Sequence, residues 1–465
     1  MPELHFIRTM LDILDFNIVF QGENEDELYT KEFINDEICH VFHATLSYNP
    51  DCCTKCGMEN NQSIIKWGFK TVNTQLNKVS EYKTFLRLKK QRFKCKNCHQ
   101  TFIAESTLTK PRCSISNRVK LKIASLLEDS VSMSFIAEQL HVSTMTVLRV
   151  LRDFYAPTLP QEVVLPKVLC FDEFKSGAFA EGAMSCILMD GKEVELMDIL
   201  ENRQKEELKA YFQRYDLENR ANVKYVVTDF YPAYITLSEE MFPNGNVLID
   251  RFHIVQLIGK TFQNHRISVM KSFHKDQQEY SHLKKYWKLL QKKQNELNWQ
   301  DRHWSASFRA YLTQTEIVDR LLAYNKELKQ GYEVYQSFLH VIQYHQKTEK
   351  QQEAIEGFQN LLKQSYKHLP ESYQTTIKTY KRYQKEILLA LQLPYSNGPV
   401  EATNNHIKVL KRTAYGFRNF INFKTRIFIN RRKSFENKKK KEKKAKIKEM
   451  NKKKRTKKSQ ATKAA

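Results

Sequence analysis

The sequence predicts a multidomain α/β protein, and three features carry this prediction. Two close pairs of cysteines lie within residues 49–105, a helical segment with few helix breakers occupies 114–155, and apolar strand-like runs alternate with amphipathic helices from residue 167 onward. At 465 residues the chain has room for roughly three or four domains of about 100–200 residues each. We therefore expect several separate cores.

The domain boundaries follow from changes in composition along the chain. The predicted segments are a weakly patterned N-terminal segment at 1–48, a cysteine-bearing domain with short strands at 49–110, a helical domain at 111–156, a proline-containing linker at 157–166, the first part of an α/β core at 167–259, an all-helical insertion at 260–393, the last part of the core at 394–435, and a Lys-rich tail at 436–465. The tail is too poor in apolar residues to bury a core, so we expect it to be disordered.

The net charge of the chain is +24, and it is unevenly distributed. From residue 431 to the end the sequence holds 18 Lys and Arg residues and 3 acidic residues, which leaves +9 for the first 430 residues. A basic excess in both parts favours a polyanionic partner, because contacts with phosphates release counterions and supply affinity that does not depend on sequence. A merely basic soluble protein is the alternative.

The cysteine content and the hydropathy pattern indicate the compartment. Nine cysteines, six of them between Cys39 and Cys98, are typical of metal ligation under reducing conditions rather than of a disulfide framework. The first residues show no basic stretch followed by an apolar core, and no run of about 18 apolar residues occurs. We expect an intracellular, soluble protein with no membrane contact.

Two C-x-x-C pairs predict a structural zinc site. Cys53 and Cys56 form the first pair, and Cys95 and Cys98 form the second after 38 intervening residues. Zinc takes four thiolates in a tetrahedral site, and each pair supplies two of them from one tight turn. Cys52 is an alternative to Cys53 as the first ligand, with a longer spacer. A site with four cysteine ligands has no open position, so this metal is not the catalytic one.

Residues 135–151 fit a helix-turn-helix that reads DNA. Ala137 allows two helices to approach, Leu140, Val142 and Val147 fill the angle between them, and Ser143 caps the second helix. The N-terminal part of that helix would enter the major groove, so the predicted DNA-binding residues are Ser143, Thr144, Thr146 and Arg149. An ordinary helical hairpin is the alternative, since the turn has no glycine.

From residue 167 the order of predicted elements is that of a ribonuclease H-like core. Strands at 167–174, 183–189 and 193–199, a helix at 203–216, a strand at 223–229, a helix at 232–242 and a strand at 246–250 follow one another, with Asp190-Gly191 as a hairpin turn. Asp172 lies on one face of the first strand, and Asp229 ends the fourth. Each aspartate alone is also compatible with a role in a turn.

Glu401 lies at the start of a basic helix and is separated from Asp229 by 171 intervening residues. It shares one helix face with Asn405, Lys408 and Arg412, an arrangement that suits a metal site next to a phosphate track. Carboxylates that share two divalent ions are the usual catalysts of phosphodiester chemistry. The alternative is a capping role, in which Gly398 is the N-cap and Glu401 occupies the third helical position.

The motifs around these acids resemble the bacterial insertion-sequence DDE transposases of the ISL-three family. The resemblance lies in residues 171–174, 228–234, 250–253, 396–401 and 411–420, and in the order of the domains. It implies a ribonuclease H-like fold, Asp172, Asp229 and Glu401 as the catalytic triad, and two Mg²⁺ ions as cofactors. It also implies a cytoplasmic, nucleoid-associated protein that assembles as a homo-oligomer on the terminal inverted repeats of an element and on target DNA.

Two other functions are alternatives to this assignment. The protein could be a DNA-binding regulator with an inactive acid core, which the intact triad disfavours, or a structure-specific nuclease, which would not need two DNA-reading modules.

Two further features of the sequence are open to more than one interpretation. His253 matches a family position, and we expect a supporting role for it rather than a catalytic one. Trp287, Trp299 and Trp304 in the insertion either pack in its core, which we favour, or stack on an unpaired base.

Overall fold

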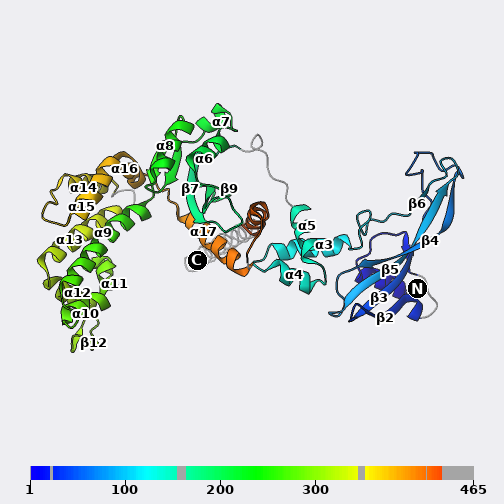
Figure 1. Cartoon of the computed structure of the whole chain (residues 1–465), viewed down its shortest axis with the longest axis horizontal. Coiled ribbons are helices and arrows are strands. Elements are labelled where there is room, and N and C mark those ends of the chain that lie inside the picture. The colour runs from blue at the N-terminus through cyan, green and yellow to red at the C-terminus, as the bar shows by residue number, and fades with distance from the viewer. Residues whose placement is uncertain (1, 21–24, 154–163, 344–350, 415, 432–465) are drawn as a thin grey trace, which may run out of the picture. The chain divides into compact units, whose positions relative to one another are not determined.

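The computed structural model describes residues 2–20, 25–153, 164–343, 351–414 and 416–431 (Figure 1). The chain divides into two units, one made of Met1–Pro157 with Ile407–Ala465 and the other of Thr158–His406. The predicted tail at 436–465 and most of the predicted linker at 157–166 lie outside the described residues. No helix in the described part is long and apolar enough to cross a membrane.

A six-stranded sheet forms the N-terminal part of the first unit. Its strands are β1 (Ile18–Val19), β2 (Tyr29–Ile34), β3 (Glu37–Leu46), β4 (Ile64–Gln75), β5 (Lys83–Cys95) and β6 (Thr101–Ile103), and the short helices α1 (Pro2–Met10) and α2 (Glu25–Leu28) accompany it. The central strand β5 alternates buried and less buried residues, as the predicted short strand in this region requires, and buries Leu86, Leu88 and Phe93. Strand β3 runs parallel to β5, so residues of the first 48 contribute to the same sheet as the cysteine pairs.

Helices α3 (Asn117–Leu127), α4 (Met133–Gln139) and α5 (Thr144–Asp153) form the second part of this unit. Ile123, Leu127, Ile136 and Val147 are fully buried between them. A further helix at 420–431 contacts this bundle, and Ile429 packs against its core. The sequence pattern grouped 394–435 with the catalytic core, whereas residues 420–431 contact the three helices that follow the sheet.

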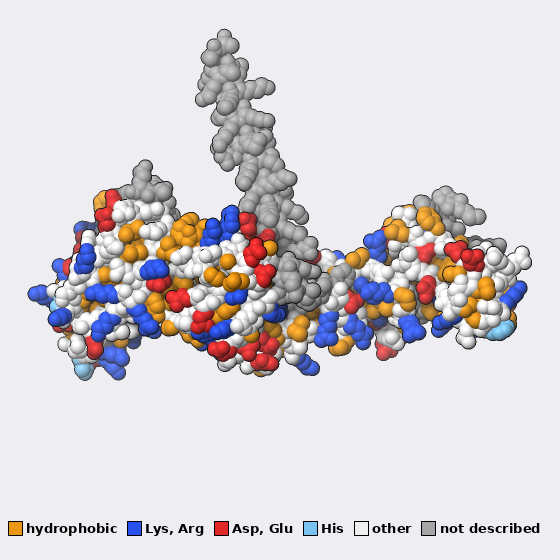
Figure 2. All heavy atoms as spheres, turned by 90° about the horizontal axis from the view of Figure 1, so that it is seen from above, with side chains coloured by type: hydrophobic (Ala, Val, Ile, Leu, Met, Phe, Trp, Pro, Cys, Tyr) orange, Lys and Arg blue, Asp and Glu red, His pale blue; other side chains and the backbone are white. Residues whose placement is uncertain are grey.

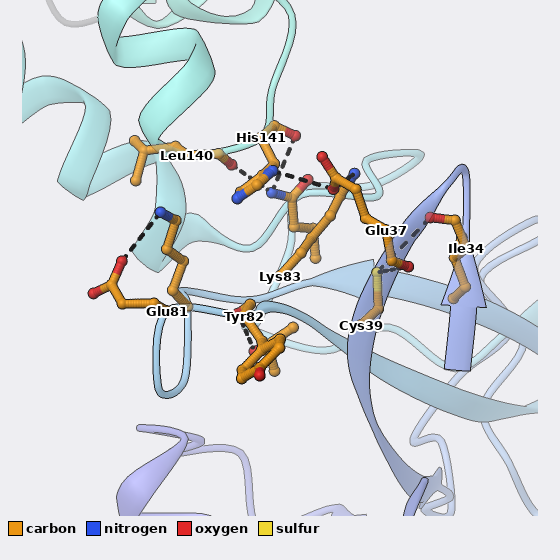
Figure 3. A network of polar contacts seen from close by, with 11 residues as sticks. Ile34, Glu37, Cys39, Glu81, Tyr82, Lys83, Leu140 and His141 are labelled. Carbon is orange, nitrogen blue, oxygen red and sulfur yellow. Dashed lines mark hydrogen bonds and ion pairs between the residues drawn. The ribbon is translucent and has the colours of Figure 1, made fainter. Parts of the chain in front are cut away.

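Polar contacts join the sheet to the turn between α4 and α5 (Figure 3). The side-chain amide of Gln75 donates to the carbonyl oxygen of Leu140 at 2.7 Å. The Glu37 carboxylate lies 3.2 Å from Nδ1 of His141 and 3.7 Å from Nζ of Lys83. His141 has a backbone φ of +49°, a left-handed turn conformation that glycine adopts more readily. The contacts from the sheet hold this turn in place.

The second unit contains a five-stranded sheet in the order β11-β10-β7-β8-β9. The strands are β7 (Val168–Lys175), β8 (Met184–Asp190), β9 (Leu196–Leu200), β10 (Tyr225–Thr228) and β11 (Asn246–Ile249), and all five lie where the sequence pattern predicts them. Strands β7, β8 and β9 form an antiparallel meander, and β10 and β11 run parallel to β7. The Asp190 side chain accepts hydrogen bonds from the backbone of Lys192 and Glu193, which confirms the predicted turn.

The two faces of this sheet carry different side chains. Phe171 and Leu169 of β7 pack on one face with two aromatic side chains, Phe212 of α6 (Lys205–Phe212) and Tyr234 of α8 (Pro232–Met241). The short helix α7 (Leu217–Ala221) follows α6 in the sequence and precedes β10. Asp172 belongs to the other face, because successive side chains of a strand alternate. Helix α17 (Gly398–Thr413) covers that face, and its Thr403 hydroxyl lies 3.3 Å from Sδ of Met189.

The insertion is mainly helical. It comprises α9 (Arg251–Ser272), α10 (Gln278–Lys285), α11 (Trp287–Gln291), the 3₁₀ turn η2 (Gln294–Glu296), α12 (Gln314–Ala323), α13 (Lys326–Gln343), α14 (Gln351–Lys363), α15 (Glu371–Arg382) and α16 (Gln384–Gln392). Aromatic side chains fill its core. Phe262 stacks on Tyr335 at 5.1 Å between ring centroids, and the buried Tyr380 hydroxyl donates to the Ile254 carbonyl at 2.6 Å.

The prediction of an all-helical insertion is wrong at one place. Strands β12 (His303–Ser305) and β13 (Ala310–Leu312) form an antiparallel hairpin. Asn298 begins the departure from helix, because its side chain accepts hydrogen bonds from the backbone of Gln300 and Asp301. Such a local bond offers the backbone an alternative to the helical pattern, and aromatic residues then favour a strand.

The buried Arg426 holds helix 420–431 on the bundle, and its removal is the first testable change. Arg426 is 1% exposed, and its guanidinium donates to the carbonyl oxygens of Asp129 and Val131 at 2.8 Å. Arg426→Met leaves both carbonyls without that donor, at a cost of about 1–3 kcal/mol. We expect amide hydrogen exchange in α3–α5 to become about tenfold faster or more, whereas the exposed Arg418→Met leaves it unchanged. Equal exchange in the two variants would show that Arg426 does not hold this helix.

Candidate active site and metal centre

Three aspartates lie in a row across the parallel strands of the second sheet. Val227 of β10 is opposite Cys170 of β7, so continuing this register by two residues brings Asp229 opposite Asp172. Thr228 is opposite Ile249 of β11, so the next pair is Asp229 and Asp250. Neighbouring strands are about 4.8 Å apart. The register therefore brings the backbone positions of the three aspartates side by side at one level of the sheet, although their carboxyl oxygens do not form a compact cluster.

Burial raises the pKa of all three aspartates. Burial raises the pKa of Asp172 to about 6, and the nearby Asp229 carboxylate adds to this, while the Glu173 backbone N–H and His253 act in the opposite direction. Burial likewise raises the pKa of Asp229 and of Asp250, and His253 again opposes the shift. A partly buried row of acids with one histidine beside it has a deficit of positive charge, which a bound cation would correct.

Glu173, next to Asp172, belongs to the opposite face and is already neutralised. Its carboxylate forms an ion pair with Arg203 and accepts a hydrogen bond from the Tyr234 hydroxyl at 3.2 Å. The Arg203 guanidinium also lies over the ring of Tyr231, 5.0 Å from the centroid. Of the two adjacent acids, Asp172 is thus the one available to a cation.

Asn397 attaches the start of the helix that carries Glu401 to the sheet. Its side-chain amide donates to the Phe171 carbonyl of β7 at 3.0 Å. The backbone N–H groups of Asn397 and Phe252 favour the ionised form of Asp250 and so oppose the rise in its pKa.

Glu401 lies in the first turn of α17 with an exposed side chain. Its backbone N–H donates to the Asn397 carbonyl at 2.9 Å, so Asn397 is the N-cap and Val400 occupies the third helical position. The capping arrangement with Gly398 as N-cap is therefore not the one observed. Among the described residues the Glu401 carboxylate has no hydrogen bond or ion pair, and it does not form a tight cluster with Asp172 and Asp229.

Asn404 connects the glutamate helix to Asp172, and sequence reasoning missed it. Its side-chain amide donates to Oδ2 of Asp172 at 2.7 Å and to the Glu173 carbonyl at 3.3 Å. Asn404 is 7% exposed, and its Oδ1 has no hydrogen-bond partner among the described residues. Residues three apart share a helix face, so Glu401 lies one turn from the contact with Asp172. Spacing from Glu401 was the signal that could have identified Asn404.

The other predicted residues of α17 are exposed. Asn405, Lys408 and Arg412 lie on the solvent side of the helix together with Glu401. Asn405 does not contact Asp172; its neighbour Asn404 does.

The predicted helix-turn-helix residues form the start of α5. Ser143 accepts a hydrogen bond from the Thr146 backbone N–H at 3.2 Å, which confirms its capping role. Thr144 and Arg149 are exposed, and Thr146 is half-buried. Ala137 and Val147 are buried in the angle between α4 and α5, with Leu140 and Val142 packed against them.

Four thiols meet beside the first sheet. The ligand atoms of Cys53, Cys56, Cys95 and Cys98 all lie within 4.8 Å of one another, and this is the only such group of three or more potential ligands in the described part of the chain. Sγ of Cys53 lies 3.7 Å from Sγ of Cys98, and Sγ of Cys56 lies 3.9 Å from Sγ of Cys95. A tetrahedral zinc with Zn–S bonds of about 2.3 Å has sulfur–sulfur edges of about 3.8 Å. The group therefore has the dimensions of a zinc site.

The backbone contacts the first pair of thiols closely. A hydrogen bond from the Met58 backbone lowers the pKa of the Cys56 thiol to about 7, whereas burial and the neighbouring thiols raise the pKa of Cys98. Gly57, which directly follows Cys56, has a φ of +74°. Cys52, the alternative first ligand, is exposed and lies outside the group.

Comparison with known proteins identifies the family. A family model described as "Transposase", DDE_Tnp_ISL3, matches residues 169–427, which is more than half of the chain. The chain belongs to the ISL3 family of DDE transposases. The matched segment begins in β7, before Asp172, and ends in the helix at 420–431.

A second comparison concerns a shorter segment. Over 120 residues the transposase is 49% identical to a protein of Lactococcus lactis subsp. lactis named "ATP-dependent protease". The match covers 26% of this chain and 36% of that protein, so the chain spans about a third of the length of this curated relative. The activity in that name is said of that protein alone.

Removal of zinc is expected to disorder the first sheet locally. Freshly purified, reduced transposase should contain about one equivalent of zinc, and Cys95→Ser should lose it, because three thiolates bind zinc more weakly than four. Cys52→Ser and Cys113→Ser change exposed thiols outside the group and should retain the metal. Metal analysis by plasma mass spectrometry reports both results. A zinc-free wild-type protein, or zinc loss in Cys52→Ser, would contradict this assignment.

The raised pKa of Asp172 predicts a gain in stability when its charge is removed. A carboxyl whose folded pKa lies near 6 instead of 3.8 favours folding most below its unfolded pKa, and this contribution is lost as the pH rises through 6. The free energy of unfolding of the wild-type second unit, taken relative to that of Asp172→Asn, should therefore rise by about 1–2 kcal/mol from pH 7.5 to pH 5 in EDTA. The difference between the two pH values removes the constant cost of placing the Asn amide against the N–H donors of Glu173 and Asn404. Thermal unfolding at both pH values measures it, and a difference that does not change with pH would contradict the burial argument.

Proposed function

We propose that this chain is the transposase of an insertion sequence, which binds the terminal inverted repeats of its element and catalyses metal-dependent DNA strand cleavage and strand transfer. The observation that carries the proposal is the partly buried row of aspartates, with the glutamate helix bonded to Asp172 through Asn404. The family membership supplies the reaction class. An intact acid row disfavours the alternative of an inactive DNA-binding regulator.

The sheet topology supports a ribonuclease H-like catalytic core. An antiparallel meander of three strands, with two further strands parallel to its first strand, is the strand order predicted for such a core. Asp172 in the first strand and Asp229 after the fourth then occupy adjacent positions. We propose Asp172, Asp229 and Glu401 as the catalytic triad on this core.

The residues at this site fit divalent cations. Asp172 and Asp229 offer carboxylate oxygens with raised pKa values, Asn404 offers a buried amide oxygen without a partner among the described residues, and Glu401 has a carboxylate with no competing ion pair there. Oxygen ligands of this kind suit Mg²⁺. We propose that Asp172, Asp229 and Glu401 hold two Mg²⁺ ions. When bound, such ions stabilise the negative charge that develops on a phosphodiester and its attacking and leaving oxygens.

The chain's own residues orient this site. The Glu173 backbone N–H and the Asn404 amide each hold one oxygen of Asp172, which fixes the carboxylate plane. Arg203 neutralises Glu173 and thereby removes a competing ligand. Fixed carboxylates need no reorganisation when the phosphate arrives.

DNA recognition is proposed for two surfaces. Ser143, Thr144, Thr146 and Arg149 at the start of α5 would contact base edges in the major groove. Asn405, Lys408 and Arg412 on α17 would contact the backbone near the acids. Lys and Arg side chains recur across the face seen in Figure 2, interspersed with Asp and Glu rather than gathered in one field. We propose that the four-thiol site binds zinc and shapes the N-terminal part of the DNA-reading unit.

The assembly and location follow from this activity. A transposase that joins two ends of one element to target DNA brings both ends together, so we propose that it acts as a homo-oligomer assembled on DNA. Its substrate is chromosomal, and we place its action in the bacterial cytoplasm at the nucleoid.

Glu401→Gln tests the triad directly. The substitution keeps the size and the helix but removes the charge, so cleavage of a labelled duplex carrying the inverted repeat that flanks the gene should fall by more than about a hundredfold. Binding of the same duplex, measured by mobility shift in EDTA, should stay within about twofold. Glu239→Gln, at an exposed position of α8, is the matched control and should cleave normally.

The same assay separates Asn404 from Asn405. Asn404→Ala removes the bond to Asp172 and should reduce cleavage by about 10–100-fold, whereas Asn405→Ala should weaken DNA binding only slightly. Mg²⁺-dependent cleavage by Glu401→Gln at the wild-type rate would exclude Glu401 from the triad and leave the proposed mechanism without support.

A further inference from the structure

A groove of about 870 Å³ opens beside Asp229. One wall is formed by the first half of α9, where Phe252, Gln256, Gly259, Lys260 and Gln263 recur at helical spacing and His253, Val255 and Leu257 complete the lining. The rest comes from residues 229–231, Gln291 and Tyr335. This volume is within the range of about 300–1,000 Å³ that is typical of small-molecule sites. Because Asp229 is part of its lining, the groove adjoins the proposed active site.

The lining combines aromatic rings with amides and one cation. Phe252 is 49% exposed, although it is a large apolar side chain next to the acids, and its ring lies against that of His253. Gln263 accepts a hydrogen bond from Arg266 through Oε1, and its Nε2 has no partner among the described residues. Lys260 is exposed at the groove. Flat rings, amide groups and a lysine are complementary to a nucleobase and its phosphate.

Gly259 keeps this groove open without being required by the fold. It lies inside the 22-residue helix α9, where glycine is unfavourable relative to alanine. A Cβ built at this position would meet only the Tyr335 ring, at 3.7 Å, which is an ordinary van der Waals contact. Because a small side chain would fit here without a clash, packing does not require the glycine. The glycine instead leaves the groove wider at this position.

The exposed tryptophans of the insertion are the competing aromatic surface. The favoured interpretation that they pack in the core is wrong for two of the three: Trp299 is 70% exposed and Trp304 is 57% exposed, whereas Trp287 is half-buried. Trp304 packs on Tyr311 across the β12–β13 hairpin, at 5.2 Å between centroids. None of the three lines the groove at Asp229. Phe252 is therefore the exposed aromatic side chain on which a base could stack in this groove.

We propose that this groove binds an unpaired nucleotide of the DNA strand whose phosphodiester lies at Asp172 and Asp229. The proposal rests on the proposed function, because that function places a DNA strand at these aspartates. In a duplex a base has both faces covered, so only a nucleotide that has left the stack can lie on the Phe252 ring. The Gln256 and Gln263 amides face the base edge, and Lys260 pairs with a phosphate.

Binding of a duplex with an overhang tests the proposal without any cleavage step. The probe is a fluorescein-labelled 20-base-pair duplex with a two-nucleotide single-stranded overhang that carries 2-aminopurine, compared with the blunt duplex, both with full-length protein in EDTA. The wild-type protein should bind the overhang duplex about tenfold more tightly than the blunt one and quench 2-aminopurine. Phe252→Ala and the groove-filling Gly259→Leu should lose both effects and still bind the blunt duplex.

Control variants make every outcome decisive. Phe252→Trp should retain quenching, Gly259→Ala should fold and bind with a smaller preference, and Trp299→Ala should behave as the wild type. A wild-type protein with no preference for the overhang would overturn the proposal, and so would loss of the preference in Trp299→Ala but not in Phe252→Ala. Failure of cleavage with the overhang preference intact would refute the proposed function alone, and intact cleavage without the preference would refute the groove alone.

Discussion

The register of three parallel strands is the constraint on which the site depends. Because Val227 is opposite Cys170 and Thr228 is opposite Ile249, three aspartates that are far apart in the sequence come to lie on adjacent strands with the same orientation. Burial then raises their pKa values, so the folded chain carries an electrostatic cost at neutral pH. A fold that retains this cost is suited to a cationic cofactor, and strain of this kind is typical of functional sites.

The glutamate helix is attached to the sheet by two side-chain amides. Asn397 precedes its first turn and donates to the Phe171 carbonyl, and Asn404 in its second turn donates to the Asp172 carboxylate. Glu401 itself remains exposed between these anchors. The helix is thereby positioned without any contact from the Glu401 carboxylate, which leaves that group available to a cation.

The sequence predicted local features well and long-range ones poorly. Apolar runs that end at Asp172 and Asp229 identified the strands of the core, because burial and strand period act over a few residues. The parallel pairing of β3 with β5 was missed, since it joins residues about 40 apart with no local signal. The hairpin at 303–312 was missed because Asn298 redirects a segment whose neighbours are helical. Asn405 was predicted instead of Asn404, because residues three and four positions after Glu401 both lie on its side of the helix. Only the contact of Asn404 with Asp172 decides between them.

The proposed mechanism requires that Asp172, Asp229 and Glu401 share one cation site. Iron-directed cleavage of the protein backbone tests this requirement, since Fe²⁺ accepts carboxylate ligands and generates radicals that cut the chain within a few ångströms of the ion. With Fe²⁺, ascorbate and peroxide, the chain should be cut near residues 172, 229 and 401, and excess Mg²⁺ should suppress these cuts. Cuts near 172 and 229 without any near 401 would contradict this requirement, because Glu401 would then lie outside the site.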